Sequence, residues 1–349
     1  MRRLPVYFLI DVSDSMIGDE LLLVQKGLRN VITNLKQNPV CLETVHVSVI
    51  IFAGKAKTLV PLQDIVTFYP PDLNVGSGTS LGTGLDHLMK ELNSNIRRTT
   101  PEAKGDWKPL VFLFTDGNPT DDPSLAINRW KNEWKNSCQT IIVSLGQEDL
   151  NPLFRSITDN IFYQASLDEK SFNQFFEWVS FSIKSTSQKI SESDIHANEL
   201  LDRVEGVEFG TPSYTDVYSQ NHVIIKGKCQ NTAELYLTKY ERQRSVENIS
   251  GIDFNTVKYR LKGAFKIGDD YDELSIVSDD SSININTEDL IGAPFCPCCG
   301  NQIGFAFCSC QKIHCIDPNP EAQNTCPWCG NKGSYGGVSG GFDVNRTLG

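Results

Sequence analysis

Near its N-terminus the chain reads Val6-Tyr7-Phe8-Leu9-Ile10-Asp11-Val12-Ser13-Asp14-Ser15, in which five apolar residues are followed directly by a segment rich in carboxylates and hydroxyls. A short apolar run with such a polar end predicts a buried β-strand that leads into a loop. Similar runs occur at Val45–Phe52, Leu110–Phe114 and Thr140–Leu145, and Leu110–Phe114 is followed by Thr115-Asp116-Gly117. This repetition predicts several buried strands of one sheet.

Amphipathic helical patterns separate these strands. Apolar residues recur at spacings of three and four in four segments, which is the period of one helix face. The four stripes are Leu21, Val24, Leu28, Val31 and Leu35; Leu81, Leu85, Leu88 and Leu92; Ile127, Trp130 and Trp134; and Phe172, Phe175, Val179 and Ile183. Strands that alternate with helices in this way predict a doubly wound, Rossmann-like α/β sheet that is mostly parallel and covered on both faces.

The sequence pattern divides the chain into five parts. The doubly wound sheet is predicted for residues 1–187, and a polar, serine-rich linker for 188–199. Short alternating strands predict a small β-rich module over 200–292. A cysteine-rich, zinc-ribbon-like domain is predicted for 293–332, and a flexible tail for the glycine-rich residues 333–349.

Charge and hydropathy limit the classes of protein to which the chain can belong. It has 349 residues, of which 43 are acidic and 32 basic, and its formal net charge of −11 argues against a nucleic-acid-binding or membrane-surface protein. The sequence contains no run of about 20 apolar residues, so we expect no membrane span. The apolar run at Val6–Ile10 is too short for a secretory signal peptide, so we expect a cytoplasmic protein.

Five oxygen-bearing residues are predicted to meet at one edge of the sheet, namely Asp11, Ser13, Ser15, Thr79 and Asp116. Loops at the carboxyl ends of parallel strands converge on one crevice, and Thr79 lies in a glycine-rich loop that we place there too. Hydroxyl and carboxylate oxygens without His or Cys suit a hard divalent cation, with Mg²⁺ first and Mn²⁺ or Ca²⁺ as alternatives. Such a set leaves a coordination position that a carboxylate of a partner protein can fill.

Catalytic interpretations of the same segments are weaker. The glycines of Gly76–Gly84 do not form a P-loop, since no Lys follows at the required spacing, and they do not match a dinucleotide-binding loop. Ser13 or Ser15 as a nucleophile would need an adjacent base, and neither His46 nor His87 lies in these loops. We therefore expect that the chain is not an enzyme.

Eight of the eleven cysteines cluster near the C-terminus, which favours metal binding over disulfides in a chain without an export signal. Two Cys-x-x-Cys-Gly segments, here called the first cysteine turn (Cys296–Gly300) and the second cysteine turn (Cys326–Gly330), are typical of zinc sites. The predicted zinc ligands are Cys296, Cys299, Cys308, Cys310, His314, Cys315, Cys326 and Cys329. We expect Cys41, Cys138 and Cys229 to be reduced and buried.

The spacing leaves the pairing of these ligands and the number of zinc ions, one or two, open. In a zinc ribbon, the first and second cysteine turns share one ion. In a cross-brace, the first turn shares an ion with His314 and Cys315, and the second turn shares another with Cys308 and Cys310. Cys298 is a further thiol inside the first turn, so a different choice of ligand there is also open.

The order Asp-x-Ser-x-Ser, then Thr, then Asp resembles the metal-ion-dependent adhesion site (MIDAS) of von Willebrand factor A (VWA) domains. The resemblance covers the predicted sheet domain and implies a VWA sheet with a short antiparallel edge strand. It also implies that Ser13, Ser15 and Thr79 touch the ion directly. Asp11 and Asp116 are implied to act directly or through water.

Together with the segment from Phe305 to Gly330, this site resembles the TerY-like VWA proteins of bacterial tellurium-resistance systems, which carry a C-terminal TerY-C metal-binding domain. The resemblance implies a non-enzymatic, cytoplasmic adaptor in phosphosignalling. Its implied partners are a metal-dependent Ser/Thr protein phosphatase and a Ser/Thr kinase, with no nucleic acid and no membrane. The predicted β-rich module carries no motif that assigns it a role.

Two other functions stay open at this point. A metal-dependent phosphoester hydrolase would use the same oxygen site, with Asp14, Asp121 or Asp122 as the base. A zinc protein that binds nucleic acid would use the cysteine-rich segment, but only Lys312 and Lys332 lie within or beside it.

Overall fold

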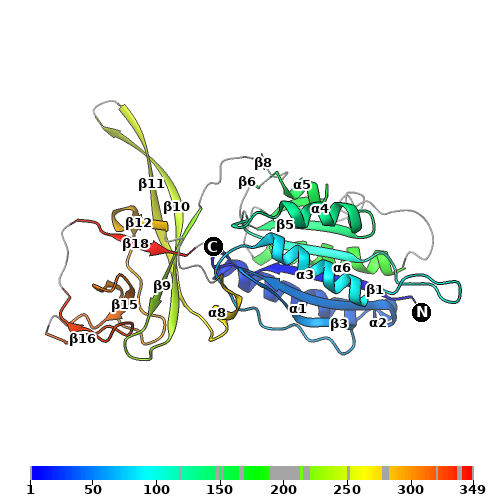
Figure 1. Cartoon of the computed structure of the whole chain (residues 1–349), viewed down its shortest axis with the longest axis horizontal. Helices are drawn as coiled ribbons and strands as arrows, with labels where there is room; N and C mark the ends of the chain where they lie inside the picture. The colour runs from blue at the N-terminus through cyan, green and yellow to red at the C-terminus, as the bar shows by residue number, and fades with distance from the viewer. Residues whose placement is uncertain are drawn as a thin grey trace. The chain divides into compact units, whose positions relative to one another are not determined.

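The chain forms two compact units in the computed structural model (Figure 1). The first comprises Met1–Tyr218 together with Glu273–Ser275, and the second comprises Ser219–Asp272 and Ile276–Gly349. The structure describes residues 2–117, 119–145, 149–150, 152–164, 169–188, 213–214, 221–249, 252–276, 283–319, 321–335 and 340–347. Within these residues, no helix combines the length and the apolar character that a membrane crossing requires.

The first unit is built on a six-stranded sheet with the strand order β3-β2-β1-β4-β5-β7. Its strands are β1 (Leu4–Asp11), β2 (Val45–Phe52), β3 (Ala56–Asp64), β4 (Leu110–Thr115), β5 (Gln139–Leu145) and β7 (Ile161–Gln164). All neighbours are parallel except the edge strand β3, which runs antiparallel to β2. The predicted doubly wound sheet is therefore confirmed, and its strand order reverses between β1 and β4, where such sheets place their sites.

Helices cover both faces of this sheet (Figure 1). They are α1 (Asp19–Lys36), α2 (Pro39–Thr44), α3 (Leu81–Asn95), α4 (Ser124–Glu133), α5 (Phe154–Ile157) and α6 (Glu169–Gln188). On one face, Trp130 of α4 shares a buried cluster with α3 and with Tyr7 of β1. On the other face, Phe176 of α6 stacks on Phe114 of β4 and leaves no room for a side chain at Gly27 of α1. Since successive strand residues face opposite helix layers, β1 is buried along its whole length.

The second unit contains a six-stranded sheet that joins two of the predicted modules. The strand order is β13-β11-β10-β9-β15-β14, with β9 (His222–Lys228), β10 (Leu235–Ile249), β11 (Ile252–Lys266), β13 (Leu290–Ile291), β14 (Ile303–Phe307) and β15 (Ile313–Ile316). β15, from the predicted zinc domain, pairs in parallel with β9, from the predicted β-rich module. Segments on both sides of the predicted boundary between residues 292 and 293 therefore contribute strands to one sheet. The cysteine-rich segment has few apolar residues of its own, and it shares a sheet with the module that precedes it.

Part of the predicted flexible tail at 333–349 forms a strand. β18 (Asp343–Arg346) pairs antiparallel with β12 (Ile283–Asn286), and Val344 is buried beside Val223, Ile225 and Tyr240. Phe342 also packs against this cluster, and the Thr347 N–H donates to the carbonyl of Ile224 at 2.9 Å, so the described residues 340–347 are held to the sheet.

The remaining elements are short. They are η1 (Asp14–Met16), β6 (Asp149–Leu150) paired with β8 (Ser213–Tyr214), α8 (Tyr271–Leu274), η2 (Thr287–Asp289), and β16 (Asn324–Thr325) paired with β17 (Lys332–Gly333). The predicted linker lies outside the described residues from residue 189 onward.

Candidate metal centres

The loops at the carboxyl edge of the first sheet bring the predicted oxygen ligands together. Asp11 is the last residue of β1, and Asp116 directly follows β4. The glycine-rich loop lies beside them, because Ser13 and Gly76 form a parallel bridge and the Gly76 N–H donates to the carbonyl of Val12 at 2.9 Å. Three segments that are far apart in the sequence thus meet at one place.

Four of the five predicted ligands belong to one hydrogen-bond network. The carboxylate of Asp11 accepts from the Ser13 N–H at 2.9 Å and from the Thr115 hydroxyl at 2.7 Å. The hydroxyl oxygens of Ser13 and Ser15 lie 3.0 Å apart, and the Ser15 hydroxyl donates to Asp116 Oδ1 at 3.0 Å. Two carboxylates and two hydroxyls are therefore linked in series by short hydrogen bonds.

Thr79, the fifth predicted ligand, is held at the same edge through its backbone. The Thr79 N–H donates to the hydroxyl of Thr120 at 2.8 Å, and the Thr120 N–H donates back to the Thr79 carbonyl at 2.9 Å. In addition, Asp121 Oδ2 accepts from the N–H of Gly82, in the first turn of α3, at 2.9 Å. The loop that carries Thr79 is thus fastened to the loop that follows Asp116.

Burial makes this oxygen set suited to a cation. Asp11 is 0% exposed, and burial raises its pKa to about 6 although hydrogen bonds from Ser13 and Thr115 act in the opposite direction. Among the described residues, no Lys or Arg forms an ion pair with Asp11. A hard divalent ion would supply the missing positive charge, and carboxylate and hydroxyl oxygens are ligands that such an ion prefers. The residues present therefore fit the metal that the sequence predicts.

Asp122, one of the carboxylates considered as a base, and the two histidines His46 and His87 have contacts of their own. Asp122 is exposed and accepts from the Ser124 N–H at 3.0 Å and the Ser124 hydroxyl at 2.6 Å, and these bonds lower its pKa. His87 Nε2 and the Thr58 hydroxyl form a hydrogen bond of 2.7 Å, away from the metal loops. His46 contacts the carbonyl of Thr44. Each of these groups has a local structural role.

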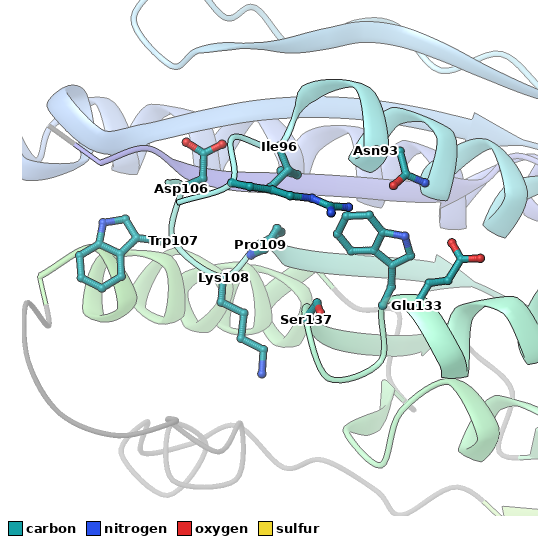
Figure 2. Close-up of a pocket in the computed structure, with 10 residues that line it drawn as sticks. Asn93, Ile96, Asp106, Trp107, Lys108, Pro109, Glu133 and Ser137 are labelled. Carbon is teal, nitrogen blue, oxygen red and sulfur yellow. The ribbon is translucent and has the colours of Figure 1, made fainter. Parts of the chain in front are cut away.

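A cavity of about 610 Å³ lies at the opposite edge of the same sheet (Figure 2). Pro109 directly precedes β4, and Trp134 and Ser137 lie between α4 and β5, so these lining residues stand where strands begin. The metal loops stand where strands end. Lys108 and Glu133 both line the cavity, and its mixed charge indicates no particular ligand.

The second unit gathers cysteines into two groups of four. Group I contains Cys229, Cys296, Cys299 and Cys315, and group II contains Cys308, Cys310, Cys326 and Cys329. Within each group all sulfur atoms lie within 4.8 Å of one another. This arrangement follows the predicted cross-brace, in which the two cysteine turns belong to different ions, and it does not follow the zinc ribbon.

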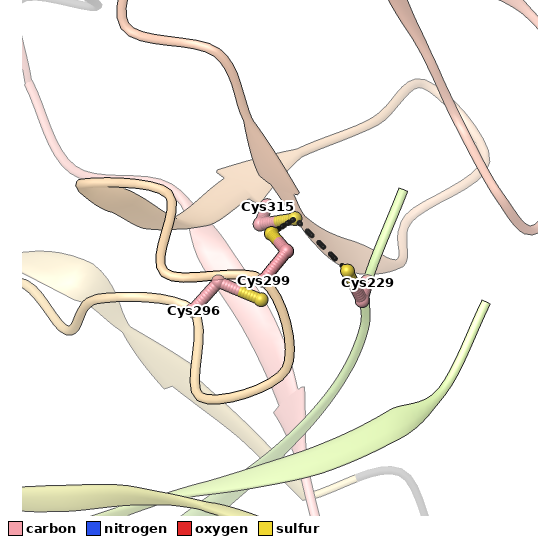
Figure 3. Close-up of side chains that lie close together, drawn as sticks. All are labelled: Cys229, Cys296, Cys299 and Cys315. Atoms are coloured by element: carbon pink, nitrogen blue, oxygen red, sulfur yellow. Dashed lines mark hydrogen bonds between the residues drawn. The ribbon is translucent and has the colours of Figure 1, made fainter. Parts of the chain in front are cut away.

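The sulfur spacing fits tetrahedral zinc. In group I the Sγ atoms of Cys299 and Cys315 lie 3.8 Å apart, as do those of Cys315 and Cys229 (Figure 3). In group II the Sγ atoms of Cys308 and Cys329 lie 3.6 Å apart, and those of Cys310 and Cys326 lie 3.8 Å apart. A tetrahedron with Zn–S bonds of about 2.3 Å has S–S edges of about 3.8 Å. Four thiolates leave no open position, so both sites have the form of structural zinc sites.

Glycine shapes both cysteine turns, as expected. The N–H of Gly300 donates to the carbonyl of Cys296, and that of Gly330 donates to Cys326, both at 2.9 Å. Their φ angles are +77° and +76°, in the left-handed region that residues with a Cβ rarely adopt. The need for glycine at the end of each cysteine turn could therefore be predicted from the sequence.

Cys229 is the metal-site residue that the sequence interpretation missed. It follows β9, and the parallel pairing of β9 with β15 brings it beside Cys315. Backbone N–H groups at Gln230 and Thr232 donate to the sulfurs of Cys315 and Cys229, as is common for thiolates that bind metal. No spacing signal marks Cys229, because its partners lie far downstream in the chain.

His314, by contrast, is a predicted ligand that belongs to neither group. It is fully buried, and its Nε2 and the Tyr335 hydroxyl form a hydrogen bond of 2.7 Å, while its Nδ1 contacts the carbonyl of Cys315 at 2.9 Å. His314 and Cys315 are neighbours on β15, and adjacent strand residues point to opposite faces. Only one of them can therefore face the group I sulfurs. Cys298 also lies outside both groups.

Models of two known protein families match the chain, one over the first unit and one over the second. The model of the von Willebrand factor type A domain matches residues 6–178, and that of the TerY-C metal binding domain matches residues 219–349. The chain is a TerY-like VWA protein. Its TerY-C domain contains both cysteine groups, and its VWA domain contains the oxygen site.

Solved structures with a similar fold come from several proteins. Proximal thread matrix protein 1 from the mussel byssus is 17% identical with a TM-score of 0.37, and the match covers 51% of this chain and 47% of that one. Another structure of it, 16% identical with a TM-score of 0.36 over 51% and 46% of the two chains, is described as having a zinc-occupied MIDAS motif. The pilus adhesin SpaC from Lactobacillus rhamnosus GG is 12% identical with a TM-score of 0.43, over 78% and 52%.

The TerY-like chain spans about half the length of the mussel protein chains that it matches. No curated protein sequence matches it.

Proposed function

We propose that the VWA domain binds one Mg²⁺ ion through Asp11, Ser13, Ser15, Thr79 and Asp116. The bound ion would hold a carboxylate of a partner protein, so that the chain acts as a non-enzymatic, metal-dependent adaptor. The observation that carries this proposal is the joined network of two buried carboxylates and two hydroxyls at the edge where β1 and β4 end.

Charge and ligand number support the partner-binding role. Two carboxylates neutralise a divalent ion, and three hydroxyls with them still leave one of the six positions that Mg²⁺ fills with oxygens. A partner carboxylate is an oxygen ligand of the right kind for that position. In this proposal the Ser15 hydroxyl and the Asp116 carboxylate, which are 3.0 Å apart, both serve as ligands of the ion.

The TerY-C domain supplies a second, structural metal function in this proposal. Groups I and II would each hold one Zn²⁺, with all positions taken by thiolates. Since group I joins Cys229 of the strand-rich part to Cys296, Cys299 and Cys315, zinc would fasten the cysteine-rich segment to the sheet.

The proposed setting is a bacterial stress system of the tellurium-resistance type, in the cytoplasm. This setting is supported by the fact that the chain belongs to the TerY-like VWA proteins. The proposed partners are a metal-dependent Ser/Thr protein phosphatase and a Ser/Thr kinase of that system. In this arrangement the adaptor would bring a phosphatase or kinase to a target through the carboxylate that its Mg²⁺ holds.

The test measures Mg²⁺ binding by calorimetry, and partner binding in buffers with and without Mg²⁺. Wild type is compared with Asp11→Ala and Ser13→Ala, and with Asp159→Asn as a control at an exposed carboxylate. Magnesium-free buffer replaces EDTA, because EDTA would also remove zinc. We expect Asp11→Ala to lose both Mg²⁺ binding and partner binding, while zinc content stays the same. If the affinity for the partner changes neither with Mg²⁺ nor with Asp11→Ala, metal bridging is refuted.

The hydrolase alternative has its own measurement. It predicts turnover of a phosphoester with added Mg²⁺ or Mn²⁺ that Asp116→Ala abolishes. The capping contacts of Asp121 and Asp122 argue against either carboxylate as a base. The adaptor proposal expects no turnover above buffer.

A further inference from the structure

Three residues from the range matched by the TerY-C model pack against the VWA domain. Glu273, Leu274 and Ser275, here called the strap, belong to the first compact unit, although the chain on both sides of them belongs to the second. Leu274 is 3% exposed and Ser275 is 7% exposed. Two of the three strap residues are therefore buried within the first unit.

The strap is bonded to the turn between β2 and β3. The carbonyl of Leu274 accepts from the Lys55 N–H at 2.9 Å, and the carbonyl of Lys55 accepts from the Ala53 N–H at 2.9 Å. The carbonyl of Ala53 in turn accepts from the Ser80 N–H at 2.7 Å. A chain of backbone hydrogen bonds thus leads from Leu274 to the residue next to Thr79. The exposed ion pair of Glu273 with Lys57, at 3.7 Å, adds little.

The strap also contacts the glycine-rich loop directly. The Ser275 hydroxyl oxygen accepts from the Ser77 N–H at 2.9 Å. A Cβ added at Gly76 would lie 2.5 Å from Leu274 Cβ, so the leucine packs directly on the loop backbone. Gly76 is the residue that bridges to Ser13. The strap therefore touches the loop on the side that joins the Asp-x-Ser-x-Ser segment.

We propose that the strap positions the metal site, with Leu274 and Ser275 as positioning residues for Thr79. The inference rests on the proposed Mg²⁺ binding. A loop with glycines at 76, 78 and 82 has many accessible backbone conformations, and Thr79 can serve as a ligand only when that freedom is removed. The loop is fastened to Thr120 and Asp121 on one side, and the strap fastens it on the other.

This arrangement makes the oxygen site dependent on a segment outside the Asp-x-Ser-x-Ser, Thr and Asp motif. The residues that bind the ion all lie before residue 117, whereas the strap is encoded far downstream. The VWA domain of this chain is thus complete only with residues 273–275 in place.

The experiment uses the full-length, zinc-loaded chain and two variants, Ser275→Ala and Leu274→Ala. Mg²⁺ affinity is measured by calorimetry, and amide hydrogen exchange is measured at Lys55 and Ser77, which donate to the strap. Loss of one hydrogen bond of ordinary strength in the metal-binding state corresponds to about fivefold weaker Mg²⁺ binding for Ser275→Ala. We expect a larger loss for Leu274→Ala, and faster exchange at Ser77 in both variants without any metal.

Matched controls separate this effect from general destabilisation. Ser94→Ala removes a hydroxyl that bonds only within α3, at the Lys90 carbonyl, and Leu22→Ala shortens a half-exposed leucine of α1. Both should keep wild-type Mg²⁺ affinity. Ser275→Thr keeps the hydroxyl and should restore most of the affinity that Ser275→Ala loses.

The outcomes distinguish the two proposals. If wild type binds Mg²⁺, Asp11→Ala does not, and both strap variants bind and exchange like wild type, the strap proposal fails and the proposed function stands. If wild type itself binds no Mg²⁺, both fail. Weaker Mg²⁺ binding in Ser275→Ala with unchanged zinc content and unchanged controls is the result that supports the strap.

Discussion

Replacing Asp11 by Asn should make the magnesium-free VWA domain more stable at pH 8 and should abolish its Mg²⁺ binding. The side chain is fully buried at the end of β1, and it meets the Ser13 N–H and the Thr115 hydroxyl. An Asn oxygen can still accept from Ser13, and its NH₂ group can donate to the hydroxyl of Thr115. The substitution therefore removes the buried charge while it keeps the local contacts.

The expected magnitude comes from the pKa of Asp11. Burial raises that pKa from 3.8 to about 6. At about 1.36 kcal/mol for each pH unit, ionised Asp11 lowers the stability of the metal-free fold by about 3 kcal/mol at pH 8. The folded chain binds this proton more tightly than the unfolded chain does. The cost is therefore absent below about pH 4, grows as the pH rises, and is complete above about pH 7.

Mg²⁺ should reverse the order of stabilities. An ion that binds only the folded state stabilises it by about 2.7 kcal/mol at a concentration one hundred times its Kd. Wild type should regain this amount on addition of Mg²⁺, and Asp11→Asn should gain nothing.

Native-state hydrogen exchange of amides in β1 and β4 measures these differences for the first unit alone, since exchange of core amides reports opening of the unit that contains them. The control is Asp159→Asn at an exposed carboxylate, which should have the stability of wild type at pH 8 with and without Mg²⁺. If Asp11→Asn is less stable than wild type at pH 8 without Mg²⁺, the charge of Asp11 is not the cost that its burial implies.

Three further predictions concern residues whose roles the tertiary structure revealed. Cys229→Ser should reduce the zinc content by about one ion per chain in elemental analysis, because it removes one of four thiolates of group I, whereas Cys298→Ser should retain wild-type zinc. His314→Ala should keep the zinc content but lower the free energy of unfolding of the TerY-C domain by about 1–3 kcal/mol, because Tyr335 loses its buried partner; zinc loss in this variant would restore His314 as a ligand. Asp121→Ala should destabilise the VWA domain by about 1 kcal/mol in denaturant titration, because α3 loses a capping carboxylate.

Local sequence patterns were sufficient to predict the first sheet and the edge at which its oxygen-bearing loops meet. Apolar runs such as Val6–Ile10 report burial within a few neighbours, and residues two apart in an extended segment face the same way. Parallel strands end at a common edge, so the segment after β1 and the segment after β4 had to meet. The ion itself and its partner stay predictions.

The contacts that hold the site in place were harder to predict from the sequence. The strap lies in a segment whose acidic composition gave no sign of burial, yet Leu274 packs on the backbone of Gly76. A single apolar residue between polar neighbours has no periodicity to mark it, and only the packed structure shows where it lies.

For the cysteine sites, too, the sequence predicted the local turns and only the tertiary structure showed the grouping of the sulfurs. The two cysteine turns and their glycines could be recognised from the sequence alone, because each turn is a local backbone geometry formed by a few consecutive residues. The choice of Cys229 over His314 as the fourth ligand of group I was made by the tertiary structure. It depends on the parallel pairing of β9 with β15, a contact between distant segments, and on the alternation along β15 that turns Cys315 toward the sulfurs and His314 toward Tyr335.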